Sequence, residues 1–212
     1  MTPPWPQPLQ PGDRVQLAAA SSALDPGALE RLQAGMALLA SWGLEVDPHP
    51  EPLRRWGHLA GDDADRHADL RARDAPLVAC IRGGWGSARL LEAAPPARPG
   101  TEGRWLLGFS DVTSLLWARQ AAGVGGGIHG PMLTGLAAEP AWSQERLRRL
   151  LFNGAAAELE PLTGRPWCRG VAEGPLLVGN LTVATHLLGT PHLPELRGAV
   201  LVLEDIGEAP YR

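Results

Sequence analysis

Cysteine is scarce in this sequence, with only Cys80 and Cys168 among 212 residues. Two cysteines cannot build a disulfide framework, and neither belongs to a C-x-x-C pair, so the sequence favours a reducing compartment. An excess of basic residues is also lacking, since 19 Lys and Arg face 23 Asp and Glu. A nucleic-acid partner therefore has no electrostatic support.

Long apolar runs are absent as well. No stretch approaches the roughly 20 apolar residues that a membrane-spanning helix needs, and residues 1–6 show no basic segment leading into an apolar one, as a secretory signal would. We therefore expect a cytoplasmic protein without a membrane partner. The sequence contains neither a G-x-x-x-x-G-K-S/T loop nor a complete G-x-G-x-x-G pattern, and no histidine pair at helical i, i+4 spacing. We expect no cofactor and no metal.

Apolar runs of strand length alternate with segments of helical periodicity. This pattern predicts an α/β fold with a largely parallel sheet and flanking helices, after a proline-rich segment at 1–10. The run at 199–203 is predicted to be a buried strand, and the charges of a polar helix at 62–74 are predicted to be solvated. The other predicted strands are 14–20, 44–46, 77–81 and 105–107.

Residues 105–116 carry the first candidate site. An apolar run ends at Gly108, Ser110 follows, and apolar residues then recur with helical spacing. A strand, turn and helix in this order would expose the Ser110 hydroxyl in the positive field of a helix N-terminus. Serine hydrolases hold their nucleophile on such an elbow, although the G-x-S-x-G pattern is incomplete here. The alternative is an ordinary helix cap, because Ser and Asp are favoured N-caps.

The second candidate is the glycine-rich turn 82–87, which follows the apolar run 77–81. Glycines at a strand-to-helix junction let the backbone approach a ligand and direct N–H groups at it, although a plain tight turn has equal odds on this pattern alone. His129 and Glu204 also follow predicted strands. Because function collects beyond the carboxyl ends of parallel strands, we expect all these residues at one edge.

Six segments together resemble the LD-carboxypeptidases, a family of serine hydrolases that includes bacterial murein tetrapeptide carboxypeptidases and microcin C immunity hydrolases. The resemblance extends from Pro11 to the last residue and implies an N-terminal domain over 11–212. The segments are IRGGWGSARLL at 81–91, GFSDVT at 108–113, HGPM at 129–132, GNL at 179–181, LGTP at 188–191 and LEDIGEAPYR at 203–212.

The resemblance implies roles for individual residues. Ser110 would be the nucleophile, and Glu204 would orient the catalytic histidine. The backbone amides of Gly84 and Asp111 would form the oxyanion hole, and no metal or organic cofactor would be needed. The candidate substrate pocket contains Arg82 and His129.

Two features depart from the family pattern. Trp85 stands where a tyrosine is common, and the family's catalytic histidine lies beyond the Glu-Asp motif, in a C-terminal domain. We therefore expect this sequence to be the N-terminal part of such an enzyme, without the C-terminal domain and nearly inactive by itself. Of the six histidines, only His129 falls at the predicted active edge, where a pocket or structural role is favoured over that of a base. The others are His49, His58, His67, His186 and His192.

The expected reaction is hydrolysis of an L,D-amide bond, with release of the terminal D-alanine of a murein tetrapeptide during peptidoglycan recycling. The partner would be a small peptide substrate, and the family resemblance allows a homodimer. Two alternatives stay open: an immunity-type hydrolase of aminoacyl-nucleotide conjugates, and a non-catalytic binding or remnant domain.

Overall fold

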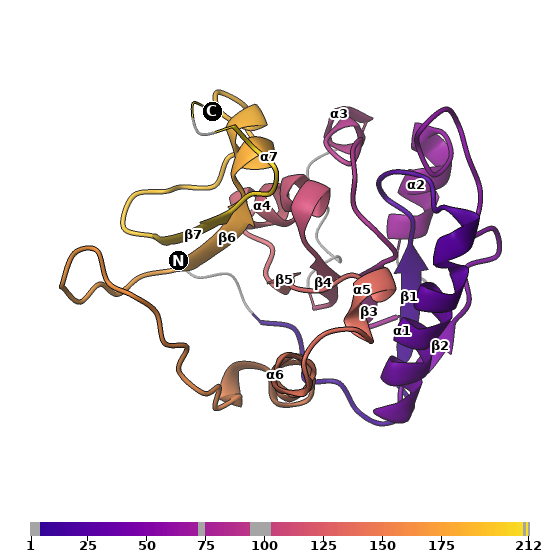
Figure 1. Cartoon of the computed structure of the whole chain (residues 1–212), viewed down its shortest axis with the longest axis horizontal. Coiled ribbons are helices and arrows are strands. Elements are labelled where there is room, and N and C mark those ends of the chain that lie inside the picture. The colour runs from indigo at the N-terminus through magenta and orange to yellow at the C-terminus, as the bar shows by residue number, and fades with distance from the viewer. Residues whose placement is uncertain (1–4, 72–74, 94–102, 210, 212) are drawn as a thin grey trace.

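The fold is a parallel five-stranded sheet covered by helices on both faces (Figure 1). The computed structural model describes residues 5–71, 75–93, 103–209 and 211. The strand order is β2-β1-β3-β4-β5, so the predicted α/β class with a parallel sheet is confirmed. The strands are β1 (Arg14–Ala18), β2 (Glu45–Asp47), β3 (Leu77–Cys80), β4 (Trp105–Gly108) and β5 (Gly127–His129).

Both faces of this sheet are buried, which explains why its strands are continuous apolar runs rather than alternating ones. Successive side chains of β3 point to opposite faces: Leu77 and Ala79 join one core cluster, and Val78 and Cys80 join the other. The sequence cannot tell the two faces apart, because both accept only apolar side chains.

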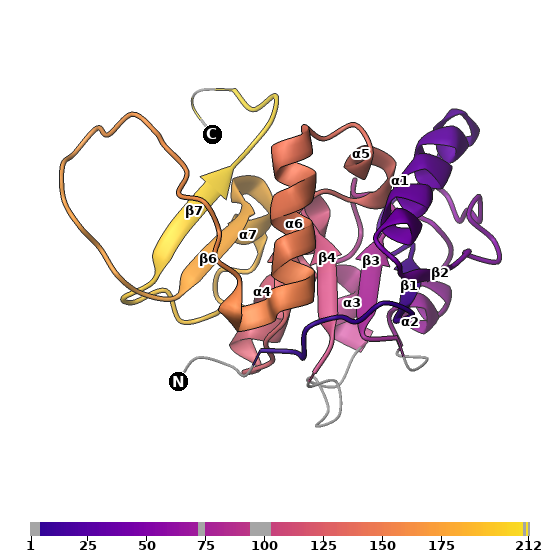
Figure 2. The same ribbon diagram turned by 90° about the horizontal axis from the view of Figure 1, so that it is seen from below.

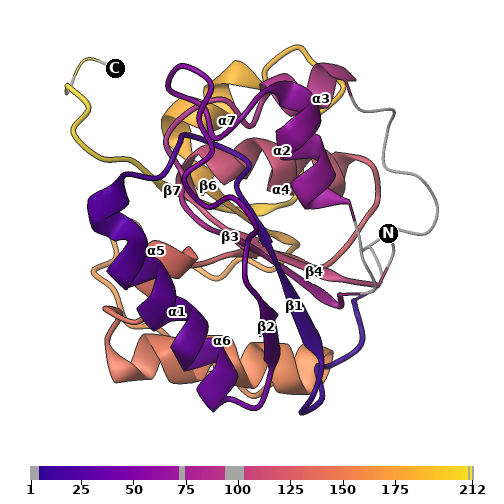
Figure 3. The same ribbon diagram turned by 90° about the vertical axis from the view of Figure 1, so that its right-hand side faces the viewer.

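One layer of helices lies on each face of the sheet (Figure 3). One group of helices covers the face seen in Figure 2, where α1 and α5 pack closely together. The other α-helices of the described residues lie on the opposite face. The first group is α1 (Leu29–Ser41), α5 (Leu133–Leu136) and α6 (Ala141–Asn153), and the second is α2 (Asp63–Leu70), α3 (Arg89–Ala93), α4 (Thr113–Ala121) and α7 (Leu181–His186).

A second, two-stranded parallel sheet is formed by β6 (Leu176–Asn180) and β7 (Val200–Glu204). It docks on the beginning of α4, where Trp117 donates a hydrogen bond to the Val178 carbonyl at 2.9 Å. The Asn180 N–H donates to Thr113 Oγ1 at 3.0 Å. These contacts fix the carboxyl end of β6 beside the helix that follows Ser110.

The prediction of a buried strand at 199–203 is wrong with respect to burial. The strand exists as β7, but Leu201, Val202 and Leu203 are 42 to 47% exposed. Only β6 pairs with β7, and no element in the described part of the chain covers its outer face. An apolar sequence run indicates a strand but does not show what packs on it.

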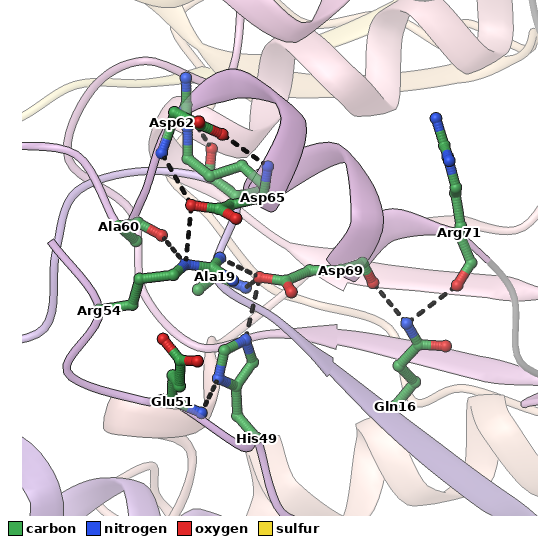
Figure 4. A network of polar contacts seen from close by, with 12 residues as sticks. Gln16, Ala19, His49, Glu51, Arg54, Ala60, Asp62, Asp65, Asp69 and Arg71 are labelled. Atoms are coloured by element: carbon green, nitrogen blue, oxygen red, sulfur yellow. Dashed lines mark hydrogen bonds and ion pairs between the residues drawn. The ribbon is translucent and has the colours of Figure 1, made fainter. Parts of the chain in front are cut away.

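The prediction that the charges of the 62–74 helix are solvated is wrong for two residues of α2; residues 72–74 lie outside the described range. Arg66 is fully buried and donates hydrogen bonds to the carbonyls of Ala20 and Gly86 at 2.9 and 2.8 Å. Asp69 lies 90% buried at the centre of a polar network (Figure 4). These two side chains satisfy backbone groups of Ala19 and Ala20, which follow β1, and of Gly86 in the glycine-rich turn, where an apolar side chain would leave them unpaired.

One carboxylate oxygen of Asp69 collects most of this network. It accepts hydrogen bonds from His49 at 3.0 Å, from Arg54 at 2.8 Å and from the Ala19 N–H at 3.1 Å. Arg54 also donates to the Ala60 carbonyl at 2.8 Å. The loop 48–61 is thereby fastened to α2 and to the end of β1 (Figure 4). Burial alone would raise the pKa of Asp69, but the hydrogen bonds and charges of His49 and Arg54 outweigh it and lower that pKa.

We expect Asp69→Ala to lower the free energy of unfolding by about 3 kcal/mol, because it leaves the partners of a buried charge unpaired. Asp47→Ala is the matched control, since its ion pair with Arg14 is nearly half exposed and should contribute less than about 1 kcal/mol. Urea unfolding at pH 7 measures both values.

The same prediction has a pH dependence. Because the pKa of Asp69 is lowered by folding, its stabilising contribution is complete above the ordinary value of 3.8 and is lost as the pH falls through the lowered pKa. The stability difference between parent and Asp69→Ala should therefore shrink below about pH 4. A difference that stays constant down to pH 2 would contradict this account.

Candidate functional site

Ser110 occupies a sharp turn between β4 and α4. Its φ is 58°, and it is the one non-glycine residue with positive φ in the described part of the chain. A short 3₁₀ turn, Ser110–Val112, then leads directly into α4. A non-glycine residue pays about 1 to 3 kcal/mol for this backbone conformation. Such strain persists only where the surrounding structure imposes it, and it is typical of functional turns.

The Ser110 side chain is half-buried and faces the glycine turn. A Cβ placed on Gly83 would lie 3.3 Å from Ser110 Cβ and 3.4 Å from Ser110 Oγ. The two turns predicted separately from the sequence are thus in contact. In the described residues, Ser110 Oγ has no hydrogen-bond partner within the chain, so its hydroxyl is free to bind another molecule.

Asp111 fastens these two turns together. Its carboxylate accepts a hydrogen bond from the Ser87 N–H at 2.9 Å, and its carbonyl accepts one from Ser87 Oγ at 2.6 Å. Ser114 also donates to the Asp111 carbonyl, at 3.1 Å. All three residues are at most 2% exposed. The carboxylate of Asp111 is therefore engaged in structure, while its backbone N–H makes no hydrogen bond in the described residues.

The glycine turn depends on a close approach of the end of β1. Gly84 has a φ of 115°, and a Cβ on it would lie 2.3 Å from Ser22 Oγ. Ser22 Oγ accepts a hydrogen bond from the Trp85 N–H at 3.0 Å. Only glycine fits at position 84, for both conformational and steric reasons.

Arg82 also binds the backbone of this region. Its Nε donates to the Gly83 carbonyl at 3.2 Å, and its Nη1 donates to the Ala23 carbonyl at 2.9 Å. Arg82 is predicted from the sequence to line a substrate pocket. In the structure, two of its nitrogen atoms are directed at the turn and at the chain that follows β1.

His129 and Glu204 come together at the same edge. His129 ends β5 and pairs in register with Gly108, two residues before Ser110. Its Nε2 lies 3.9 Å from Glu204 Oε1, and its ring contacts Phe109 edge to face at 6.0 Å. His129 Nδ1 and Glu204 Oε1 are buried atoms without a hydrogen-bond partner in the described residues.

Burial lowers the pKa of His129 to about 4. The imidazole is therefore neutral at pH 7, even with a carboxylate nearby. A neutral ring can accept a proton or donate one hydrogen bond, so its chemistry near Ser110 is that of an uncharged polar group.

The carboxyl end of β7 is held by the N-terminus of α7. Asp205 accepts hydrogen bonds from the Thr182 N–H at 3.0 Å and from Thr182 Oγ1 at 2.8 Å, and these bonds lower the pKa of Asp205. Asn180 caps α7 by accepting from the Val183 N–H at 3.1 Å. Glu204 is thus presented by a well-anchored strand end beside β6.

The structure therefore brings together the predicted site residues at the carboxyl ends of β3, β4, β5 and β7. Sequence reasoning missed Ser22 and Arg66, which form hydrogen bonds with the backbone of the glycine turn. The pair of serines after the first predicted strand is a signal for Ser22, whereas nothing in the sequence distinguishes Arg66 from its charged neighbours. The described residues contain no group of three metal-ligating side chains.

Two family models match the sequence. Residues 15–130 match the N-terminal domain of LD-carboxypeptidases, and residues 173–212 match the C-terminal domain of the same family. The first match contains Ser110 and the glycine turn, and the second contains Glu204.

Curated relatives are similar along almost the whole chain. A putative carboxypeptidase of Synechocystis is 45% identical over 212 residues, covering 98% of this chain and 68% of the relative. The murein tetrapeptide carboxypeptidase of Pseudomonas aeruginosa is 37% identical over 221 residues, covering 96% of this chain and 70% of its own length. This chain thus spans about two thirds of the length of these relatives.

Solved structures share the fold. A muramoyltetrapeptide carboxypeptidase from Oxalobacter formigenes is 26% identical with a TM-score of 0.73, over 94% of this chain and 68% of that one. The microcin C7 self-immunity protein in complex with aspartyl sulfamoyl adenosine is 21% identical with a TM-score of 0.78, over 96% of this chain and 71% of that one.

Within the described residues, no helix is both long and apolar enough to span a bilayer.

We expect the His129 ring to titrate near pH 4 in an NMR experiment on its ring nitrogens, because burial disfavours the charged form. Glu204→Gln should lower this midpoint further by removing a nearby negative charge. A midpoint at or above the ordinary value of 6.5 would contradict the effect of burial on the pKa of His129.

Proposed function

This chain belongs to the LD-carboxypeptidase family of serine peptidases, and we propose that it hydrolyses the bond between an L-centre and a terminal D-amino acid. Ser110 is the proposed nucleophile. The observation that carries this proposal is the left-handed backbone of Ser110 at the junction of β4 and α4. That geometry projects a hydroxyl from the edge of the sheet, as a nucleophile elbow requires.

The proposed oxyanion hole consists of the backbone N–H groups of Gly84 and Asp111. Three observations support it: neither N–H has an acceptor in the described residues, their turns are in contact, and the buried Ser87–Asp111 hydrogen bonds hold those turns together. Preorganised donors of this kind stabilise the charge that develops on the carbonyl oxygen when Ser110 attacks.

Glu204 is the proposed acid that orients the catalytic histidine. Its buried Oε1 is an acceptor without a donor in the described residues, which suits a carboxylate that receives an imidazole N–H. In the described residues, no histidine nitrogen forms a hydrogen bond with Ser110 Oγ. We therefore propose that this 212-residue chain turns over slowly, and that His129 lines the substrate pocket.

The domain boundary differs in this proposal from the one predicted at residue 212. We place it between residues 157 and 173, because β6 begins a separate sheet and the second family model starts at residue 173. The site would then be shared between the N-terminal domain and the strand end that carries Glu204.

The substrate we propose is a murein tetrapeptide in the cytoplasm, with D-alanine as the product released during peptidoglycan recycling. The names of relatives support this choice, since the P. aeruginosa relative is a murein tetrapeptide carboxypeptidase. The second candidate is an aminoacyl-nucleotide conjugate, which the fold shared with the microcin C7 self-immunity protein keeps open. A homodimer remains part of the proposal.

We expect Ser110→Ala to release D-alanine from a murein tetrapeptide no faster than the parent chain, because removing a second member of an incomplete triad costs little further rate. The parent chain should release it at a rate about 10⁴ to 10⁶ below that of a complete serine triad, because the described residues supply no base to Ser110. Ser143→Ala, a substitution in α6 on the other side of the molecule, should leave the rate unchanged. Mass spectrometry of overnight reactions measures all three.

Three outcomes separate the alternatives. Turnover of the parent chain at an ordinary enzymatic rate, about 1 to 10³ per second, would show that an internal base serves Ser110. Faster cleavage of an aspartyl sulfamoyl adenosine would favour the immunity-type hydrolase. Release by the parent that is no faster than in buffer without protein would contradict the proposed oxyanion hole and favour a non-catalytic domain, because an oxyanion hole alone still accelerates hydrolysis about 10³- to 10⁴-fold over water.

A further inference from the structure

We infer that Arg82 and Ser22 are positioning residues that aim the N–H of Gly84 into the oxyanion hole. The inference rests on the proposed function and adds to it a role for two side chains that contact the turn and not the scissile bond. In this inference Arg82 positions the turn, instead of lining the substrate pocket as predicted from the sequence.

The Gly83 carbonyl and the Gly84 N–H belong to the same peptide unit. This unit is planar and trans, as no cis peptide bond occurs in the described residues, so its C=O and N–H point in opposite directions. Whatever holds the Gly83 carbonyl therefore also sets the direction of the Gly84 N–H. Two donors hold that carbonyl: the Ser22 N–H at 3.3 Å and Arg82 Nε at 3.2 Å.

The next peptide unit is held as well. Ser22 Oγ accepts from the Trp85 N–H at 3.0 Å, so Ser22 binds the turn on both sides of Gly84. Glycine has the widest backbone freedom of all residues, and two successive glycines would leave this turn loose without such contacts. The left-handed φ of Gly84, 115°, persists because both neighbouring peptide units are fixed.

The anchors themselves are rigid. Arg82 Nη1 donates to the Ala23 carbonyl at 2.9 Å, so the guanidinium bridges the turn and the chain after β1 in a fixed fork. The loop 48–61 backs this chain, since the Ala60 N–H donates to the Ser21 carbonyl at 3.0 Å and the Ala23 N–H donates to the His58 carbonyl at 2.8 Å. The polar network around Asp69 fastens that loop in turn (Figure 4).

Together these contacts fix the direction of the Gly84 N–H toward the proposed oxyanion hole before substrate binds. Ser110 lies against Gly83 on the side where a Cβ would project, so a small rotation of the Gly83–Gly84 peptide unit would move the amide relative to the hydroxyl. Removing one oxyanion donor from a serine hydrolase costs about 10² to 10³ in rate. Misdirecting one should cost part of that.

The test measures the reaction of Ser110 with a small alkyl fluorophosphonate, which does not require turnover. In this reaction the bond between Oγ and phosphorus forms, the P–F bond breaks, fluoride leaves and the serine proton passes to the buffer. We would compare Arg82→Met, Arg82→Lys and Ser22→Ala with the parent. Arg55→Met is the matched control, because Arg55 Nη2 donates to the neighbouring Leu24 carbonyl and not to the turn.

We expect Arg82→Met and Ser22→Ala each to lower the second-order rate constant by about 10- to 100-fold. Arg82→Lys should recover part of the loss because it keeps a donor that Met lacks, and Arg55→Met should react like the parent. The dissociation constant of uncleaved murein tetrapeptide, measured by calorimetry, should stay unchanged, because the amide acts on the developing charge. Melting temperatures of all variants are recorded alongside.

An unchanged rate constant in Arg82→Met would overturn the inference. A dissociation constant that weakens in parallel with the rate would also overturn it and would identify Arg82 as a substrate-binding residue. If Arg82→Met does not fold, Ser22→Ala decides by the same criteria. Failure of the proposed function looks different: Ser110→Ala would still be labelled, or the parent would not be labelled at all.

Discussion

The buried hydrogen bonds between Ser87 and Asp111 are the interaction on which the candidate site depends. They join the turn after β3 to the turn after β4 through two residues that are almost fully buried. Without them, the left-handed backbone at Ser110 would have no reason to persist, since strain of this kind relaxes unless its surroundings impose it. The carboxylate of Asp111 is therefore committed to structure, and its neighbour Ser110 is left for chemistry.

The outer support of the site is built from charged residues instead of an apolar core. Arg66 is fully buried and binds two carbonyls, and Asp69 gathers Arg54, His49 and a backbone N–H on one oxygen. Backbone groups just beyond the ends of parallel strands have no partner in the sheet, so long polar side chains are needed to satisfy them. The same bonds restrict the loop 48–61, and through it the segment that carries Ser22.

The parts of the site that follow from a local sequence pattern could be predicted. The burial of a side chain could not be predicted where it depends on segments distant in the sequence. The apolar run, glycine and serine at 105–110 indicate a strand followed by a turn, and the structure has both. In contrast, the exposure of β7 depends on what covers it, and the burial of Arg66 depends on the carbonyls of Ala20, after β1, and of Gly86, in the glycine-rich turn. A polar helix repeats its charges at the same spacing whether one face is buried or all are solvated, so the pattern cannot reveal these contacts.

The central claim is that Ser110 and two backbone amides form one catalytic centre. A crystal structure of the chain treated with a phosphonofluoridate analogue of the D-alanine substrate, which loses fluoride as the bond between Ser110 Oγ and phosphorus forms, tests it most directly. We predict a tetrahedral adduct on Ser110 Oγ, with one phosphonyl oxygen about 2.7 to 3.1 Å from the N–H groups of Gly84 and Asp111. An adduct on another residue, or one whose oxygens contact neither amide, would contradict the account.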